Sequence, residues 1–250
     1  MARGVAYIGL GKPRSFAHDA LYALADFPVP PLVRGEDWIP ASGPLVVTAN
    51  HYERPGLWMT WPVLYLTHLV EERTGQDTHW VAIEEWETLS FHGIPVPRSL
   101  IRLLFSHTFA TYGILAMPSP DAPAGERAAA IRAAARLVRH QHTIGLMPEG
   151  TVGPTPELLP ARPGVGTFLL LLAAAGARIL PVGLFEEDCH LVANIGQPFH
   201  LAVPPETPKD GRDTAARQRV MLAIRDLLPE PLWGAYRPAG LTERGPGSDL

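Results

Sequence analysis

The sequence predicts an α/β fold in which a mostly parallel central sheet is covered by helices. Strand-like and helix-like segments alternate along the chain, which is typical of parallel strands joined by helical crossovers. Of its 250 residues 46% are hydrophobic, which is enough to bury the core of one large domain. The 27 prolines and 23 glycines predict many loops and short elements.

Three segments are expected along the chain. Residues 1–44 should hold an N-terminal helix, with apolar residues at helical spacing over 14–27, and a proline-rich connection. Residues 45–228 should form the main α/β domain. The tail, residues 229–250, is expected to be irregular.

Strands and helices follow from the spacing of apolar residues within the main domain. Apolar runs predict strands at 45–49, 79–83, 112–117, 143–147, 179–184 and 191–195. Helical spacing predicts helices at 56–72, 100–109, 124–140, 164–175 and 213–228. The helix at 124–140 has Glu126 early and Arg139 late, as the helix dipole favours. The most apolar run, 165–175, is about half of the roughly 20 residues that cross a bilayer, so it predicts a buried helix.

Composition excludes several classes of function. A formal net charge of -4 gives no electrostatic reason to expect a nucleic-acid partner. Cys189 is the single cysteine, so no intramolecular disulfide and no cysteine-built zinc site are expected. The ten histidines form no metal-binding helix motif, and we expect no metal. Residues 1–10 lack the pattern of a secretory signal, so a cytoplasmic location is expected.

Two candidate catalytic side chains follow predicted strands. Asn50 and His51 lie between the strand at 45–49 and the next helix, where an imidazole can act as a general base. Glu149 lies in Met-Pro-Glu-Gly-Thr, directly after the strand at 143–147. Since open α/β sheets bind ligands at the carboxyl ends of their strands, both residues are candidates for one site.

These motifs resemble the lysophospholipid and glycerol-phosphate acyltransferase superfamily. The likeness rests on Asn50-His51, on Tyr112-Gly-Ile-Leu, on Met-Pro-Glu149-Gly-Thr about a hundred residues after the histidine, and on Ile-Leu-Pro181-Val. It implies acyl transfer from acyl-coenzyme A or acyl carrier protein to a hydroxyl of a glycerolipid, as in phospholipid biosynthesis. The resemblance further implies that His51 is the base, that the Glu149 loop shapes the acceptor site, and that no cofactor is required.

The chain departs from the family pattern at three places. The family has an aspartate five positions after the histidine, where this sequence has Gly56. Disabling the corresponding aspartate of a serine-protease triad lowers turnover about 10⁴-fold, or roughly 5 kcal/mol. Two family arginines are also replaced, one in the stretch 116–119 and one by Val152-Gly153, which argues against a standard phosphorylated acceptor.

Other residues are candidates for the missing roles. Glu53, on the same loop as His51, and Glu149 are the candidate carboxylates to orient the imidazole, so the catalytic set is His51, Glu149 and Glu53. Arg54, Arg98 and Arg162 are candidates to restore positive charge. The predicted substrate-binding residues are Asn50, Arg54, Gly150, Thr151 and Arg162.

Three functions remain open at this stage. The first is an acyltransferase with a degenerate motif, whose partners are an acyl donor and a lipid acceptor. The second is a non-catalytic lipid- or acyl-chain-binding protein on the same fold, and the third is an acyl thioester hydrolase. A lipid acceptor implies peripheral attachment to the inner face of the membrane.

Overall fold

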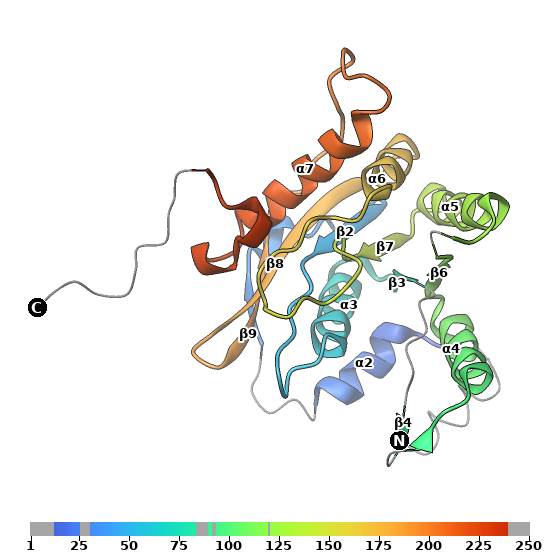
Figure 1. Ribbon diagram of the computed structural model, residues 1–250. Coiled ribbons are helices and arrows are strands. Elements are labelled where there is room, and N and C mark those ends of the chain that lie inside the picture. Colours follow the sequence, from blue (N-terminus) through green and yellow to red (C-terminus); the bar gives the residue numbers. More distant parts are fainter. Residues whose placement is uncertain (1–12, 26–30, 84–89, 92–93, 120, 240–250) are drawn as a thin grey trace, which may run out of the picture.

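The computed structural model describes residues 13–25, 31–83, 90–91, 94–119 and 121–239, and Figure 1 shows one large twisted sheet with helices on both faces. Within these residues the sheet has seven strands. Their order is β1 (Leu32–Arg34), β9 (His190–Ile195), β8 (Arg178–Glu187), β2 (Leu45–Ala49), β7 (Thr143–Leu146), β3 (Thr78–Ile83) and β6 (Leu115–Met117). A separate hairpin pairs β4 (Ser90–Phe91) with β5 (Ile94–Pro95).

The predicted fold class is confirmed. Neighbouring strands from β8 to β6 are all parallel, while β9 returns antiparallel to β8 and pairs in parallel with β1. The β8–β9 connection is a tight hairpin in which Asp188 and Cys189 both have positive φ, at 50° and 66°. Two positive φ values are what a two-residue hairpin turn requires, so the last strand can return without a helix.

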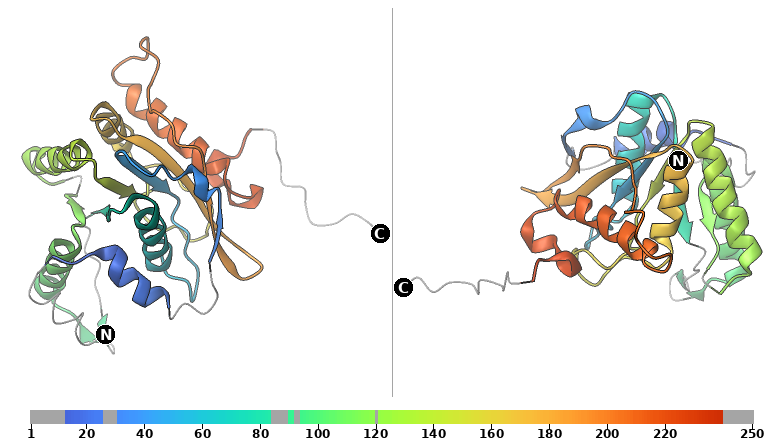
Figure 2. Two further views of the ribbon diagram at one scale, coloured as in Figure 1. Left: turned by 180° about the vertical axis from the view of Figure 1, so that it is seen from behind. Right: turned by 90° about the horizontal axis from the view of Figure 1, so that it is seen from above.

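Helices form a layer on each face of the sheet. α2 (Phe16–Leu24) and α3 (Thr60–Thr74) pack together on one face. The other face carries α5 (Ala124–Arg139), α6 (Val165–Ala174) and α7 (Arg212–Arg225), which lie side by side in both views of Figure 2. α4 (Arg98–Tyr112) lies beyond the β6 edge and contacts α2 through Tyr112 and Phe16. Among the described helices none has the length and apolar character needed to span a membrane.

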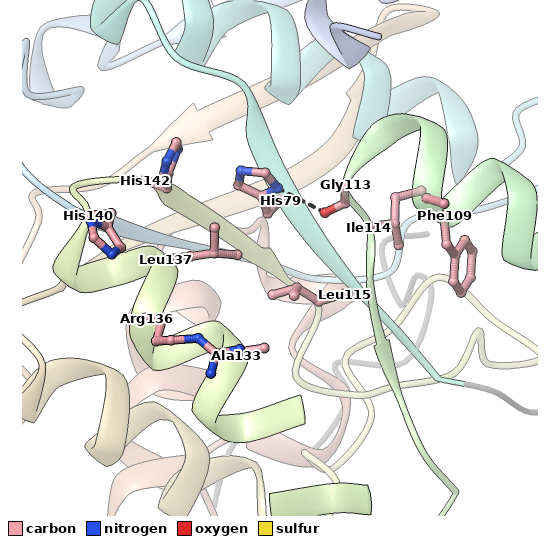
Figure 3. A pocket seen from close by; sticks show the side chains of 11 residues that line it. His79, Phe109, Gly113, Ile114, Leu115, Ala133, Arg136, Leu137, His140 and His142 are labelled. Carbon is pink, nitrogen blue, oxygen red and sulfur yellow. Dashed lines mark hydrogen bonds between the residues drawn. The ribbon is translucent and has the colours of Figure 1, made fainter. Parts of the chain in front are cut away.

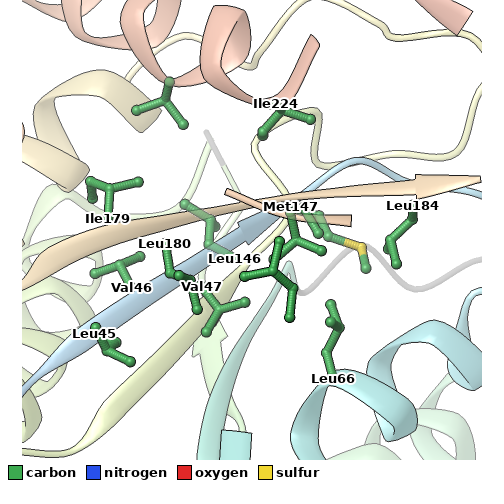
Figure 4. Packing of buried hydrophobic residues seen from close by; sticks show 14 of the residues in the cluster. Leu45, Val46, Val47, Leu66, Leu146, Met147, Ile179, Leu180, Leu184 and Ile224 are labelled. Carbon is green, nitrogen blue, oxygen red and sulfur yellow. The ribbon is translucent and has the colours of Figure 1, made fainter. Parts of the chain in front are cut away.

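The core is centred on the middle strands. All five residues of β2 are buried, because β2 is flanked by β8 and β7 and covered by helices on both faces. In Figure 4 Leu66 of α3 lies on one side of β2 and Ile224 of α7 on the other. The strands therefore read as continuous apolar runs, as expected for a parallel sheet buried on both faces.

Some elements differ in extent from the sequence prediction. The helix expected at 56–72 begins at Thr60, because Pro55 and Gly56 form a tight turn between Arg54 and Leu57. Strand β1 lies within the segment expected only to connect. Residues 230–236 form two short 3₁₀ turns, Glu230–Leu232 and Gly234–Tyr236, bonded to the Leu158 backbone. The division into segments at residues 44 and 229 stays a prediction.

The topology places a switch point between β2 and β7. These strands are adjacent, yet β2 leads into α3 on one face while β7 leads, through a long loop, into α6 on the other. Crossovers that leave on opposite faces open a crevice at the carboxyl ends of the two strands, where α/β proteins bind ligands. His51 follows β2 and Glu149 follows β7, so both lie at the carboxyl ends of these two strands.

A substitution at Gly145 tests how tightly β7 packs against the Trp80 ring. A methyl group on Gly145 would lie 2.4 Å from the Trp80 ring, which Thr67 holds by a 2.8 Å hydrogen bond from the indole N–H. We expect Gly145→Ala to lower the free energy of unfolding by about 1–3 kcal/mol through overpacking.

Gly125 in the first turn of α5 is the matched control, because a methyl group there meets no atom within 4 Å. Gly125→Ala should be neutral or stabilising by up to about 1 kcal/mol. Urea denaturation of the two variants compares them, and equal stability of both would contradict the packing described for Trp80.

Candidate active site

Asn50 fixes the backbone that carries His51. Its side-chain N–H donates to the carbonyl oxygen of Leu184 at 2.9 Å, and its side-chain oxygen accepts from the Leu184 N–H at 2.7 Å. Asn50 is 1% exposed, so its amide is held against β8 and away from solvent. This contact gives Asn50 a positioning role. The substrate contact predicted for it would require the amide to leave β8.

Glu149 lies directly against His51. Its Oε2 is 3.1 Å from Nδ1 of His51 and accepts the His51 backbone N–H at 2.5 Å. Its Oε1 accepts the backbone N–H of Leu159 at 2.9 Å. The side chains are 9% exposed for His51 and 1% for Glu149, so the pair is largely shielded from water.

The contacts of Glu149 select one form of the imidazole. A carboxylate only accepts hydrogen bonds, so Nδ1 of His51 must carry the hydrogen that faces Glu149. In the neutral ring Nε2 is then unprotonated and able to take a proton. The carboxylate would also stabilise the imidazolium formed after proton transfer, as the aspartate does in a serine-protease triad.

The loop after Glu149 turns back through Gly150 towards Arg162. Gly150 has a φ of 65°, and the Arg162 backbone N–H donates to Pro148 at 2.9 Å. The Arg162 side chain crosses Gly150 so closely that a Cβ there would lie 2.6 Å from its Cδ. Gly150 is therefore needed for its backbone and for this approach. Thr151, the next residue, is exposed.

The loop after His51 uses Glu53 and Gly56 differently from the family pattern. The Glu53 carboxylate accepts the Met59 N–H at 3.1 Å, next to the start of α3. Gly56 has a φ of 88° and follows Pro55 in the turn closed by Arg54 and Leu57. A proline followed by a residue of positive φ is the composition of a type II turn. The structure thus brings Glu149, and not Glu53, to the imidazole.

Arg54 ties this loop to the β8–β9 hairpin. Its guanidinium binds the Glu186 carboxylate with two nitrogens, Nε at 2.7 Å and Nη2 in an ion pair, and the Tyr52 hydroxyl also donates to Glu186 at 3.2 Å. The hydrogen bond from Arg54 lowers the pKa of Glu186. Burial, with the nearby Glu186 charge, raises the pKa of Tyr52. Arg54, predicted to bind substrate, is thus engaged by an acid of its own chain.

Sequence reasoning missed two partners in this region. Tyr52 was overlooked although it follows His51 directly, and Glu186 lies two residues beyond the end predicted for its strand. Only the pairing of β8 beside β2 brings Glu186 to the His51 loop. Across the described ranges, no group of three or more histidine, cysteine or acidic side chains is arranged to hold a metal ion.

Comparison with known proteins identifies the family. Residues 31–184 match the model of the family described as Acyltransferase. The chain belongs to the acyltransferase family. The resemblance drawn from the His51 and Glu149 motifs is therefore confirmed, and these motifs lie within the matched residues.

A solved acyltransferase has a similar fold. It is the 1-acyl-sn-glycerophosphate acyltransferase PlsC from Thermotoga maritima, with a TM-score of 0.50, 15% sequence identity, and coverage of 85% of this chain and 78% of that chain. At this identity the likeness concerns the fold alone. A search of curated proteins gave no match.

The assignment of Glu149 as the partner of His51 can be tested on the resting acyltransferase. Nitrogen-15 NMR of the imidazole should show the form with hydrogen on Nδ1, because only that form donates to the carboxylate. Glutamine has one oxygen for the backbone N–H groups of His51 and Leu159 and carries no charge, so in Glu149→Gln the preference for hydrogen on Nδ1 should weaken and the population should move towards the form with hydrogen on Nε2.

Glu53→Gln is the control for this measurement. Its carboxylate accepts from Met59, so the change should leave the His51 signals unaltered. The assignment fails if Glu53→Gln moves the imidazole equilibrium and Glu149→Gln does not.

Proposed function

We propose that this chain transfers a fatty acyl group from an acyl thioester, acyl-coenzyme A or acyl carrier protein, to a hydroxyl of a glycerolipid or related acceptor, with His51 as general base. The observation that carries the proposal is the contact between Nδ1 of His51 and the buried Glu149 carboxylate at 3.1 Å. Membership of the acyltransferase family supports the reaction class.

The reaction follows from the free nitrogen of His51. Nε2 takes the proton of the acceptor hydroxyl as its oxygen attacks the thioester carbonyl carbon. A new carbon–oxygen bond forms, the carbon–sulfur bond breaks, and the departing thiolate takes the proton back from the imidazolium. General base catalysis of this kind contributes about 10²–10⁴-fold to rate.

Glu149 supplies what the missing aspartate would provide. An orienting carboxylate has to hold Nδ1–H and stabilise a positive ring, and its position in the sequence does not matter to that chemistry. Glu149 provides this carboxylate from the loop after β7, whereas the family aspartate would lie at the position of Gly56. The turn at Gly56 has a backbone conformation that side chains other than glycine seldom adopt, so it would disfavour an aspartate there.

The proposal also concerns the identity of the acceptor. The Thermotoga maritima enzyme is named for a phosphorylated acceptor, a 1-acyl-sn-glycerophosphate. Arg162, which lies across Gly150 beside the Glu149 loop, is the residue that we propose approaches an acceptor phosphate. Thr151 and Val152-Gly153 follow on the same loop, where the family pattern has its arginine. Acceptors with and without phosphate therefore belong in every assay.

The base is tested by measuring coenzyme A release from long-chain acyl-coenzyme A, with lysophosphatidic acid, monoacylglycerol or no acceptor. We expect release to depend on an acceptor in the wild type and to fall about 10²–10⁴-fold in His51→Ala, because the base is lost. His200→Ala, at an exposed position, is the matched control and should retain activity.

The same assay separates the alternatives. Release without an acceptor, with free fatty acid as product, would identify a hydrolase in place of a transferase. No release from acyl-coenzyme A or acyl carrier protein thioesters, together with retained lipid binding, would identify a binding protein. Equal rates for wild type and His51→Ala would remove His51 from the mechanism.

We further propose that the loops at the carboxyl ends of the strands, which carry His51 and Glu149, contact the cytoplasmic face of the membrane. Trp58 on the His51 loop is 69% exposed, and Val152 on the Glu149 loop is 39% exposed. An exposed tryptophan beside a site for lipid substrates is typical of contact with a bilayer interface.

Sedimentation with liposomes tests this contact. The Trp58→Ser/Val152→Ser double variant should bind at least about threefold less protein to vesicles, since burial of a large apolar side chain contributes roughly 1.5–3 kcal/mol. Leu171→Ser removes an apolar side chain that is 45% exposed late in α6, and this variant should bind as the wild type does. A wild type that stays in the supernatant with every lipid composition would contradict the proposal.

A further inference from the structure

A hollow lies at the amino ends of the strands, opposite the end of the sheet that carries His51. Its volume is about 520 Å³, and it is bounded by the second half of α5, the end of α4 and the amino ends of β3, β6 and β7. His142 comes just before β7 and Glu149 just after it, so the four residues of β7, about 13 Å of strand, separate the two regions. This hollow is therefore distinct from the candidate active site.

The lining combines an apolar wall with basic groups. Ile114, Leu115 and Leu137 provide aliphatic surface, and Figure 3 shows Phe109 and Ile114 on the α4 side. The charged or titratable lining groups are His79 from β3, Arg136 from α5, His140 at its end and His142 before β7, while α4 contributes none. There is no carboxylate among the lining residues. The volume and the apolar wall are typical of sites for small ligands.

The basic groups are available to an anion. Nδ1 of His79 donates to the carbonyl oxygen of Gly113 at 2.8 Å, so Nε2 becomes a donor to an anion when the ring is protonated. The rings of His79 and His142 have centroids 5.2 Å apart. Arg136 is exposed and, within the part of the chain that the structure describes, forms no ion pair with a carboxylate. Arg136 thus places a positive charge at an apolar pocket whose lining residues include no acid.

The close contact at Gly113 shows that this edge is tightly built. Gly113 has a φ of 63°, and a Cβ there would lie 2.7 Å from Nδ1 of His79. Glycine permits both the turn at the end of α4 and the approach of the imidazole. His79 is therefore held at the pocket by a backbone contact.

We propose that this pocket binds an amphiphilic monoanion, an alkyl chain of medium length that ends in a carboxylate. The carboxylate lies at the imidazoles of His140 and His142, and the Arg136 side chain, one turn before His140 on α5, reaches it from the rim of the pocket. The alkyl chain lies against Ile114, Leu115 and Leu137. This site is independent of the proposed acyl transfer at His51, because it shares no residue with it.

The protonation of His142 also favours a negatively charged ligand. Burial, together with the neighbouring His79 and His140, lowers the pKa of His142, so its ring is neutral at pH 7 in the free protein. A bound carboxylate favours the protonated ring and raises that pKa, so binding takes up protons. Affinity should accordingly be higher at pH 6 than at pH 8.

The proposal is tested by titrating the whole chain with decanoate while the signals of the histidine rings are monitored by NMR. Decanoate should shift the signals of His79 and His142, and decanol, which lacks the charge, should bind at least about tenfold more weakly. Arg136→Gln should weaken decanoate binding by about tenfold or more, because one charge-assisted hydrogen bond is lost.

Two further variants complete the design. Ala133→Trp fills the pocket from α5 and should abolish the shifts, while Arg132→Gln, an exposed change on the same helix, should leave them unaltered. Arg136→Gln carries the test alone if Ala133→Trp does not fold.

Several results would overturn the proposal. They are shifts confined to His51, equal affinity for decanol and decanoate, and wild-type affinity in Arg136→Gln. If acyl carrier protein without an acyl group shifts His79 and His142 while decanoate does not, the pocket is a protein-docking surface and the proposal is wrong.

Discussion

The candidate site depends on one buried carboxylate. Removing an ionised carboxyl from water is costly unless hydrogen bonds replace the lost hydration, and Glu149 is 2% exposed. Two N–H groups, from His51 and Leu159, together with Nδ1 of His51 surround it. Because these donors come from the end of β2 and from the loop before α6, Glu149 holds together segments about a hundred residues apart in the chain.

This arrangement explains how the chain can lack the family aspartate. The loop after His51 is ordered by contacts that leave the imidazole to Glu149: Glu53 caps the start of α3, and Arg54 and Tyr52 bind Glu186. Each contact satisfies a polar group that would otherwise need water or substrate. The loop that carries His51 is therefore held by its own acid, Glu53, and by Glu186 of β8, and neither of these acids contacts the imidazole.

The carboxyl ends and the amino ends of the parallel strands carry sites of different chemical character. At the carboxyl edge an acid is buried against an imidazole, and two exposed apolar side chains, Trp58 and Val152, lie on the surrounding loops. At the amino edge an apolar hollow is lined by an arginine and three histidines and no acid. Both follow from the same topology, because parallel strands collect the residues that begin them at one edge and those that end them at the other.

The sequence by itself determined the fold class, the order of six of the seven strands of the main sheet and of the helices between them, and the two motifs of the site. These features are local: apolar runs and helical spacing report which side chains are buried, and His51 and Glu149 each follow a run that reads as a strand. The role of each acid was not local. Glu53, two residues from His51, and Glu149 were both candidates, and the pairing of β2 with β7 places Glu149 at Nδ1.

Tertiary structure also decided the contacts of the remaining candidates. Asn50 and Arg54 meet β8 because that strand lies beside β2, a pairing that joins residues about 130 positions apart. Gly56 read as the loss of an aspartate, and its φ of 88° shows that the turn itself selects glycine. The hollow at the amino edge was invisible in the sequence, since its histidines are scattered and only the sheet brings them together.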